Sequence, residues 1–152
     1  MASEQHQIIE QQRDEAEIYE GEAMCKQKSQ LLLDEILFPK GLLPLDNIVE
    51  MGYNRVTGFV WLKQRHEKVH RFNSIGRTVF FDTEITAFVE EHHMRRITGV
   101  KTKEFFVWFT ITEIFVNDPS SDKITFANSS GIARSFPFSA FTLQEESTHQ
   151  HQ

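Results

Sequence analysis

The chain has 152 residues, a formal net charge of −6, 39% hydrophobic residues and a single cysteine. This length predicts one domain that can bury a hydrophobic core without disulfides, because one cysteine forms no internal bridge. The acidic balance, with no extended basic face, argues against general nucleic-acid binding. The lone Cys25 favours a reducing compartment, and cysteine cannot supply a metal cage.

The start of the sequence predicts a location inside the cell. Residues 1–7 contain neither a basic patch followed by an apolar run nor a small-residue cleavage site. No apolar run in the sequence approaches the length that a bilayer-spanning helix needs. We therefore expect a cytoplasmic protein without a transmembrane segment.

Acidic and aromatic residues are unevenly distributed along the chain. Residues 1–38 hold nine acids and three bases, whereas residues 39–152 hold thirteen of each. Thirteen of the fourteen phenylalanines lie beyond position 58. The sequence thus predicts an acidic leading segment followed by a neutral, aromatic-rich body.

The acidic leading segment divides into two parts. Residues 1–13 are polar and rich in glutamine, so we predict a disordered tail there. Residues 14–38 favour helix, since Glu, Ala, Lys, Gln and Leu dominate and apolar residues recur near one face. We predict an amphipathic helix packed on the domain, weakened in its middle by Gly21 and ended by Pro39.

The body, residues 39–143, is predicted to be a β-rich domain. Strands are expected at 48–53, 59–62, 79–89, 94–98, 104–116, 124–127 and 132–138. The segment 104–116 is apolar on both faces, which predicts a central strand covered on both sides. One helix followed by short strands predicts a mainly β fold, an antiparallel barrel or sandwich capped by the N-terminal α-helix. Residues 144–152 are polar and predict a second disordered tail.

Four separated blocks in the body carry a family resemblance. They are Gly41-Leu42-Leu43-Pro44, Gly58-Phe59-Val60-Trp61, Thr98-Gly99-Val100-Lys101 and Ser135-Phe136-Pro137. With these blocks in this order, the run from Gly41 to Phe141 resembles a plant family catalogued as domain of unknown function 538. That family includes proteins that affect trichome size and branching, and the resemblance extends over most of the chain.

The resemblance implies a fold and a setting. The family looks like an all-β barrel or sandwich with an N-terminal helix, similar to lipid-binding proteins of the bactericidal/permeability-increasing type. Its members are tied to plant growth, trichome form and stress responses, and a link to chlorophyll binding or breakdown is suggested. Many members carry a signal peptide, and this chain looks like the subgroup that lacks one. The resemblance assigns no catalytic residue to this sequence.

The run His66-Glu67-Lys68-Val69-His70 has the H-E-x-x-H spacing of zinc metallopeptidases. In those enzymes the motif lies on a helix, where both histidines face the same side. Here it lies between two predicted strands, and residues four apart on a strand are about 13 Å from each other. Because one zinc ion cannot bridge that distance, we expect a solvated hairpin and no metal site.

Other candidate catalytic groups have simpler explanations. His92 and His93 lie beside Glu90 and Glu91, but adjacent strand residues point to opposite faces, which predicts a polar turn. Cys25 falls on the apolar side of the predicted helix and is expected to be a small core residue. The sequence therefore predicts no catalytic residue and no cofactor.

Dense aromatic residues and one basic run remain as candidate binding features. The candidate ligand-binding residues are Phe59, Trp61, Phe81 and Phe109 for an apolar group, and Arg65, Lys68 and Arg71 for an anionic headgroup. Aromatic side chains are also ordinary core material, so packing is the competing interpretation. A small barrel can enclose an apolar ligand, and a basic run beside it can hold an anion.

We therefore expect a non-enzymatic plant protein that binds an apolar or amphipathic ligand, a lipid or a pigment, in growth or stress responses. Two alternatives stay open: a weak hydrolase of a pigment or lipid ester, and a protein-interaction adaptor that uses exposed sheet edges and the acidic helix. Retained lipid would favour the first hypothesis, turnover the second, and a stoichiometric protein partner the third. The oligomeric state stays open.

Overall fold

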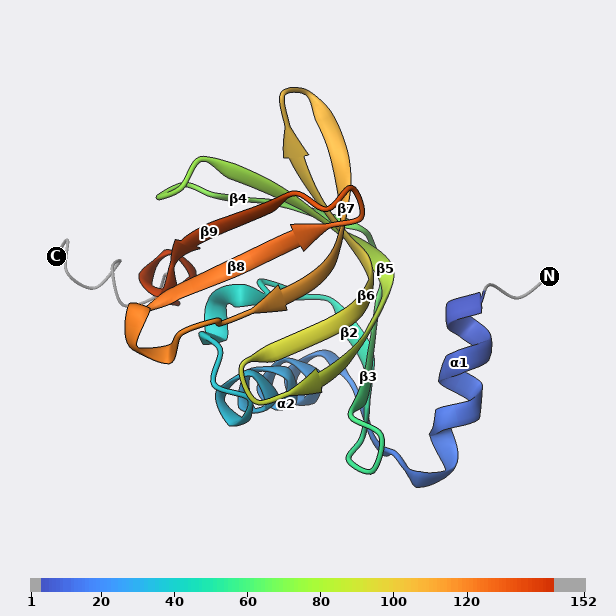
Figure 1. Cartoon of the computed structure of the whole chain (residues 1–152). Coiled ribbons are helices and arrows are strands. Elements are labelled where there is room, and N and C mark those ends of the chain that lie inside the picture. The colour runs from blue at the N-terminus through green and yellow to red at the C-terminus, as the bar shows by residue number, and fades with distance from the viewer. Residues whose placement is uncertain (1–3, 144–152) are drawn as a thin grey trace, which may run out of the picture.

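A computed structural model describes residues 4–143 and contains one nine-stranded antiparallel sheet (Figure 1). The strands are β1 (Glu17–Glu20), β2 (Ile48–Asn54), β3 (Phe59–Gln64), β4 (Lys68–Phe72), β5 (Arg77–Glu90), β6 (His93–Glu104), β7 (Val107–Phe115), β8 (Lys123–Asn128) and β9 (Ala133–Pro137). Neighbours follow the order β1-β2-β3-β5-β6-β7-β8-β9, and β4 pairs with β5. The predicted mainly antiparallel β fold is confirmed. The sheet curls like a barrel, but β9 and β1 do not pair to close it.

The curl of the sheet depends on the long strand β5. Its first part pairs with β4 and its last part with β3, so one strand serves both halves of the sheet. Between Phe81 and Thr86 the register against β6 shifts. Gly99 on β6 lies at this shift with φ of +82°, and a Cβ there would come 2.4 Å from the Glu84 carbonyl oxygen. Glycine thus permits the close approach at which the two strands bend.

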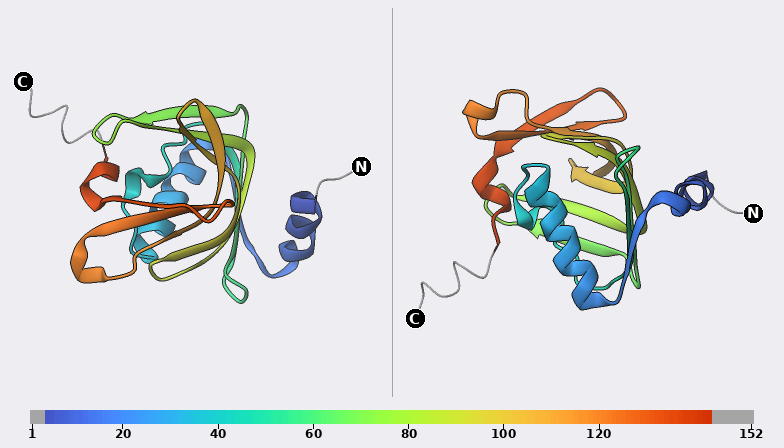
Figure 2. Two further views of the ribbon diagram at one scale, coloured as in Figure 1. Left: turned by 45° about the horizontal axis from the view of Figure 1, so that its top comes forward. Right: turned by 90° about the horizontal axis from the view of Figure 1, so that it is seen from below.

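Helix α2 (Glu22–Glu35) lies along the concave side of the sheet and covers its open edge (Figure 2). One side of the helix, carrying Cys25, Leu32 and Leu33, is buried in the main core. The helix ends with Leu37 at φ of 67°, while the Phe38 amide donates to the Leu33 carbonyl at 2.8 Å. This is a Schellman ending with leucine where glycine is usual, and it directs the chain toward β2.

The structure corrects both predictions for the N-terminal segment. Residues Glu4–Gln12 form helix α1, where a disordered tail was expected over 1–13; residues 1–3 lie outside the described residues, as does the predicted tail 144–152. The predicted helix over 14–38 is wrong in its first part, because Glu17–Glu20 is strand β1, paired with β2. The change from strand to helix occurs at Gly21, whose φ is +94°.

Helix α1 covers part of the convex side, across β2 and β3 from α2 (Figure 2). Successive residues of β3 point to opposite faces of the sheet. Val60 and Leu62 belong to the main core, whereas Phe59 and Trp61 form a second cluster with Ile9 of α1. The molecule therefore has an inner core under α2 and a smaller outer core under α1.

The strand predicted over 104–116 is present as β7 from Val107 to Phe115, but its predicted start and its predicted cover on both faces are wrong. The chain reverses direction at Phe105 and Phe106, and these residues join β6 to β7 as a hairpin. Phe105 is 85% exposed and Phe106 is 94% exposed. An apolar pattern on both faces of this segment therefore does not correspond to burial on both faces.

Candidate ligand-binding site

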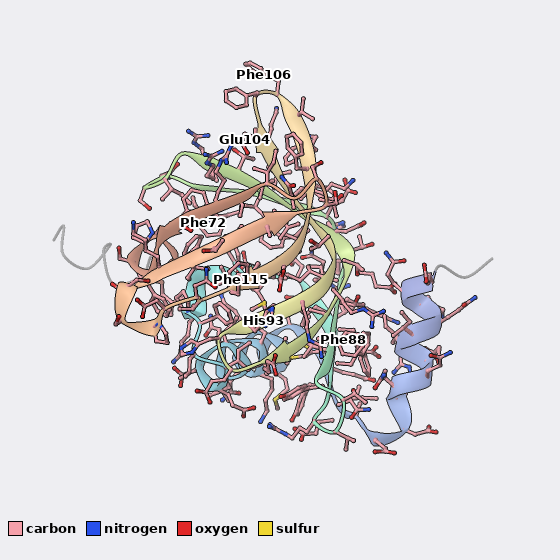
Figure 3. The ribbon with its side chains drawn as sticks, in the orientation of Figure 1. Phe72, Phe88, His93, Glu104, Phe106 and Phe115 are labelled. Atoms are coloured by element: carbon pink, nitrogen blue, oxygen red, sulfur yellow. The ribbon has the colours of Figure 1, made fainter. Side chains whose placement is uncertain are left out.

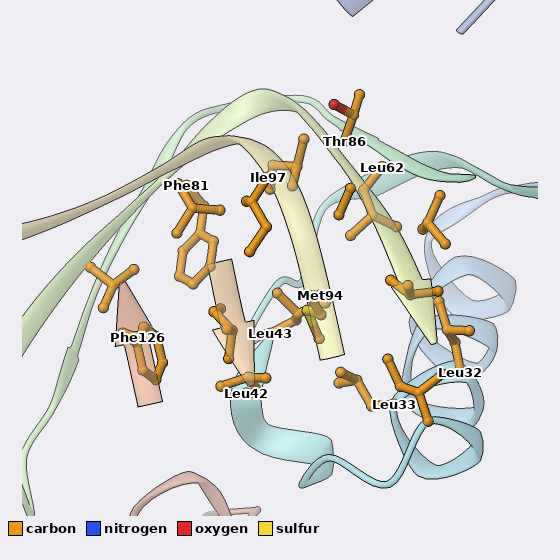
Figure 4. Close-up of a pocket in the computed structure, with 18 of the residues that line it drawn as sticks. Leu32, Leu33, Leu42, Leu43, Leu62, Phe81, Thr86, Met94, Ile97 and Phe126 are labelled. Atoms are coloured by element: carbon orange, nitrogen blue, oxygen red, sulfur yellow. The ribbon is translucent and has the colours of Figure 1, made fainter. Parts of the chain in front are cut away.

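An enclosed cavity of about 50 Å³ lies between α2 and the concave face of the sheet (Figure 4). Its walls include Leu32 and Leu33 of α2, Leu43 of the connector between α2 and β2 (residues 36–47), and Leu62, Phe81 and Met94 of the sheet. Thr86 is the only polar residue among the described residues that line it, and its hydroxyl lies 2.6 Å from the Thr98 hydroxyl. Because that hydroxyl already has a partner, the cavity is suited to a hydrocarbon group.

A second void of about 20 Å³ is adjacent and shares Phe72, Val79 and Phe126 with the first. At its far side Glu104 accepts hydrogen bonds from Arg134, the shortest at 2.8 Å. The first void is thus apolar, whereas the second is lined by both apolar and charged side chains.

An open hollow of about 260 Å³ lies at the mouth of the barrel, between α2, the connector and β4. It shares Leu43 and Phe72 with the enclosed cavity, so these two side chains stand between the hollow and the cavity. The Phe72 ring packs edge-on against Phe141, with ring centroids 5.0 Å apart, and is buried. Leu43 is only partly buried, which makes it the less firmly held of the two.

The hollow at the mouth is mainly cationic. Lys26, Lys40 and Lys68 line it together with one carboxylate, Asp46. The Lys68 ammonium donates to Asp46 Oδ2 at 3.1 Å, and Lys26 donates to Oδ1 at 3.3 Å. The hydrogen bond from Lys68, followed by that from Lys26, lowers the pKa of Asp46 against the opposing effect of burial.

His70 lines the same hollow, and its imidazole favours the neutral form. Burial lowers the pKa of His70, and the nearby Lys68 charge lowers it further. Near neutral pH the lysines therefore determine the positive charge of the hollow, and His70 contributes mainly an aromatic surface against Phe72, with ring centroids 4.6 Å apart.

The structure does not bring the four predicted aromatic residues together. Phe81 points into the enclosed cavity, but Phe59 and Trp61 point to the other face of the sheet, under α1. Phe109 is half-buried opposite Thr102 in the β6–β7 hairpin and does not line the cavity. The sequence could not separate these positions, because the face on which a side chain lies depends on strand register.

Trp61 has a structural role on the convex face. Its indole Nε1 donates to Glu50 Oε1 at 2.9 Å, and the same oxygen accepts from Arg13 Nη2 at 2.9 Å. The Arg13 guanidinium carbon lies 5.4 Å from the centre of the indole ring. The ring covers Gly52 so closely that a Cβ there would lie 2.1 Å from Trp61 Cζ2. Trp61 is fully buried by these contacts, with no surface left for a ligand.

Of the three predicted basic residues, Lys68 alone lines the hollow at the mouth. Arg65 is exposed and donates to Glu22 at the start of α2 at 3.0 Å. Arg71 is exposed and donates to the Thr78 hydroxyl at 3.4 Å. Sequence analysis missed Lys26 and Lys40; the Gly41-Leu42-Leu43-Pro44 block beside Lys40 was the one available signal for this region.

The fold and its cavity can now be compared with known proteins. The family described as "Protein of unknown function, DUF538" matches residues 29–142, which include every strand from β2 to β9. The chain belongs to the DUF538 family. No curated protein and no solved structure shows a significant match to it. Helix α1 and strand β1 of this DUF538 protein precede the matched region.

The H-E-x-x-H run of this DUF538 protein is not helical. His66 lies in the turn after β3, and His70 lies on strand β4. Within residues 4–143, no three His, Cys, Asp or Glu side chains are grouped so that they could hold a metal ion. Over the same residues, no helix has the length and apolar character needed to cross a membrane.

Two side chains that could act as a nucleophile or a general base, Cys25 and His93, are engaged in other contacts. Cys25 is buried, its thiol donates to the Tyr19 carbonyl at 3.3 Å, and burial raises its pKa. This disfavours the thiolate that nucleophilic catalysis requires. His93 Nε2 is hydrogen-bonded to Glu113, outside the enclosed cavity.

Proposed function

We propose that this DUF538 protein is a non-enzymatic binding protein that holds the apolar part of an amphipathic anion between α2 and the concave face of the sheet. The observation that carries the proposal is the contact between an apolar cavity and a cationic hollow through Leu43 and Phe72. An apolar tail gains from leaving water, and an anionic headgroup is attracted to the lysines. Plant growth or stress responses, implied by the family resemblance, are the proposed setting.

The size of the cavity limits how a tail can enter. A cavity of roughly 150 Å³ accommodates benzene, whereas the enclosed cavity here is about 50 Å³. A longer chain therefore requires Leu43 and the end of α2 to move outward. The connector containing Leu43 belongs to no strand, so it can move without breaking a ladder of the sheet.

The headgroup preference follows from the charges at the mouth. Lys26 and Lys68 share Asp46, and Lys40 adds a third cation to the hollow. A carboxylate or phosphate headgroup would bind at the rim, where solvent screens the interaction. We therefore expect a modest preference for anionic over neutral ligands of equal chain length, and we expect it to weaken with salt.

The first test is native mass spectrometry of the purified protein, followed by organic extraction of retained molecules. Fatty acids, lysophospholipids and porphyrin pigments are then titrated against the apo protein by calorimetry. Retained or titratable ligand supports the proposal. Turnover of an ester would instead favour the hydrolase alternative, and a stoichiometric protein partner with no ligand uptake would favour the adaptor alternative.

Cavity filling provides a sharper test. Ala87 lines the cavity from β5, so Ala87→Ile adds three carbons to a space of about 50 Å³. We expect this variant to fold and to bind its ligand at least about tenfold more weakly. Ala133→Ile on an exposed position of β9 makes the same change away from the cavity and serves as the control. Equal affinity in both variants would place the ligand elsewhere, and Val100→Ile provides a smaller filler if Ala87→Ile does not fold.

A further inference from the structure

The β6–β7 hairpin projects from the sheet and carries Phe106 at its tip (Figure 3). Phe105 and Phe106 are almost completely exposed, and Val107 and Trp108 follow with about half their surface in solvent. Four consecutive large apolar residues at a projecting tip are unusual on the surface of a soluble domain, where such groups tend to mark interaction sites.

The hairpin tip extends beyond its neighbours in the sheet. The last pair between β5 and β6 joins Thr78 to Lys103, and β7 pairs with β8 only from Ile111 onward. Residues 107–109 of β7 therefore lack a paired strand on the β8 side, and the Glu104–Val107 pair with its turn lies beyond the last paired residue of β5. The tip can therefore contact a surface outside the protein without disturbing the main core.

The backbone of the turn is poorly suited to its residues. Phe105 and Phe106 have φ values of 51° and 66°, the left-handed region that two-residue hairpins fill with Asn-Gly. Bulky side chains disfavour this region. Their rings do not recover that cost by burial in the fold, since both are exposed. A partner that covers the rings would explain this pair of residues.

The surroundings of the tip are basic, although the chain as a whole has a net charge of −6. On one face, Lys103 lies 5.7 Å from the centre of the Trp108 ring and Lys101 lies 5.6 Å from that of Phe80. On the other face, Glu104 is the acid closest to the tip, and Arg134 and Arg77 lie 2.8 Å and 3.7 Å from its carboxylate. The tip thus has two lysines on one face and two arginines that share one carboxylate on the other, an excess of positive charge.

We propose that the β6–β7 hairpin docks this protein on an anionic membrane surface. Phe105 and Phe106 enter the boundary between headgroups and acyl chains, and Trp108 lies at headgroup level, where indole rings are favoured. Lys101 and Lys103 contact the anionic headgroups. A narrow convex tip suits a fluid lipid surface better than a protein partner, because stable protein interfaces require a broad complementary area. This docking is independent of ligand binding in the cavity.

The experiment is co-sedimentation of the full chain with phosphatidylcholine vesicles that contain phosphatidylserine, and with vesicles of phosphatidylcholine alone. We expect binding to the anionic vesicles that falls with salt and is much weaker on the neutral ones. The variant Phe105→Asn/Phe106→Gly places favoured residues in the turn, so it keeps the hairpin while it removes the rings. We expect it to bind at least about tenfold more weakly.

Two further variants separate the contributions of rings and charge. Lys101→Gln/Lys103→Gln is expected to lose most of the preference for phosphatidylserine and most of the salt dependence. Val56→Ser removes an apolar residue that is 77% exposed in the β2–β3 turn, and it should bind as the unaltered chain does. Equal loss in Val56→Ser would indicate nonspecific adsorption and would overturn the proposal.

Tryptophan quenching locates the bound face. Vesicles with brominated acyl chains should quench Trp108, which is 40% exposed near the tip, whereas Trp61 is buried under α1. The quenching should disappear in Trp108→Phe. The proposal is wrong if the unaltered chain does not bind anionic vesicles at low salt, or if the Asn-Gly variant binds equally well. A concentration-dependent dimer that the Asn-Gly variant abolishes, without vesicle binding, would assign the tip to a second copy of the chain.

Discussion

Two aromatic segments of this protein have similar sequences and opposite environments. Phe59-Val60-Trp61 lies on β3, flanked by β2 and β5, and its outward rings are covered by α1. Phe105 to Phe109 spans the β6–β7 hairpin, where the first two rings are in solvent. The difference arises from neighbours: the first segment has a strand on each side and a helix above, whereas the second contains a hairpin turn and lacks a paired strand on the β8 side. Aromatic content alone therefore distinguishes neither core from surface nor packing from binding.

The largest expected effect tests which tryptophan holds the fold together. Trp61→Ala should lower the free energy of unfolding by about 3–5 kcal/mol, because it removes a fully buried ring and one of the hydrogen bonds to Glu50. Trp108→Ala should cost under about 1 kcal/mol, since that ring is 40% exposed. Chemical denaturation of both variants measures the difference. Similar losses in the two variants would contradict the distinction between the segment that α1 covers around Trp61 and the exposed segment around Trp108.

The close contact between Trp61 and β2 gives the next prediction. Gly52→Ala places a Cβ 2.1 Å from Trp61 Cζ2, so the indole must move, and we expect a loss of about 1–3 kcal/mol. The same substitution in a Trp61→Ala background should cost much less. A double-mutant cycle by chemical denaturation measures this coupling. Additive losses would show that Gly52 is required for a reason other than the ring.

Protonation of Glu50 should weaken the cover formed by α1. Burial acts to raise the pKa of Glu50, but hydrogen bonds from Trp61 and Arg13 lower it below its ordinary value of 4.5. Since the folded-state pKa is depressed, this stabilisation is present above pH 4.5 and is lost as pH falls through the folded-state pKa. Glu50→Gln should cost about 1–2 kcal/mol at neutral pH and progressively less in acid.

The measurement is the free energy of unfolding of both proteins as a function of pH. Glu91→Gln, which changes an exposed carboxylate in the β5–β6 turn, is the matched control and should follow the unaltered chain. Parallel pH profiles for Glu50→Gln and the unaltered chain would mean that Glu50 does not link α1 to the sheet.

The smallest expected effect has the opposite sign. Phe105→Asn/Phe106→Gly relieves two left-handed backbone positions and should raise the free energy of unfolding by about 1 kcal/mol. Thermal and chemical denaturation measure it. A loss of stability would show that the exposed rings pack within the fold after all, and it would bring the two aromatic segments closer together in role.

Much of the fold was predictable because alternation along the strands was clear. Thr83, Ile85 and Ala87 share one parity within β5, and the strand extends over this whole segment. Strand β1 was missed because Glu17–Glu20 is too short to show a period, and its pairing with β2 is long-range. The hairpin tip was missed because turn prediction relies on Gly, Asn or Pro, and Phe105-Phe106 offers none of these.

The candidate site was predictable only in part, for a related reason. Phe81 and Lys68 were identified because aromatic and basic residues are visible as such, and they lie at the cavity and its mouth. The partners that complete the cavity, such as Leu33 and Met94, come from distant parts of the chain and meet through register and curl. Neither the register of the strands nor the curl of the sheet can be deduced from local composition.

The buried position of Cys25 has a practical consequence. Its thiol faces the sheet from α2 and is shielded from solvent while the helix is docked. A thiol reagent can react with Cys25 only when α2 moves away from the sheet. The labelling rate therefore measures how often that opening occurs. The entry of a tail that we propose would also require α2 to move. A saturating ligand that lowers the rate of Cys25 labelling would show, from a single atom, that α2 opens less often when the ligand is bound.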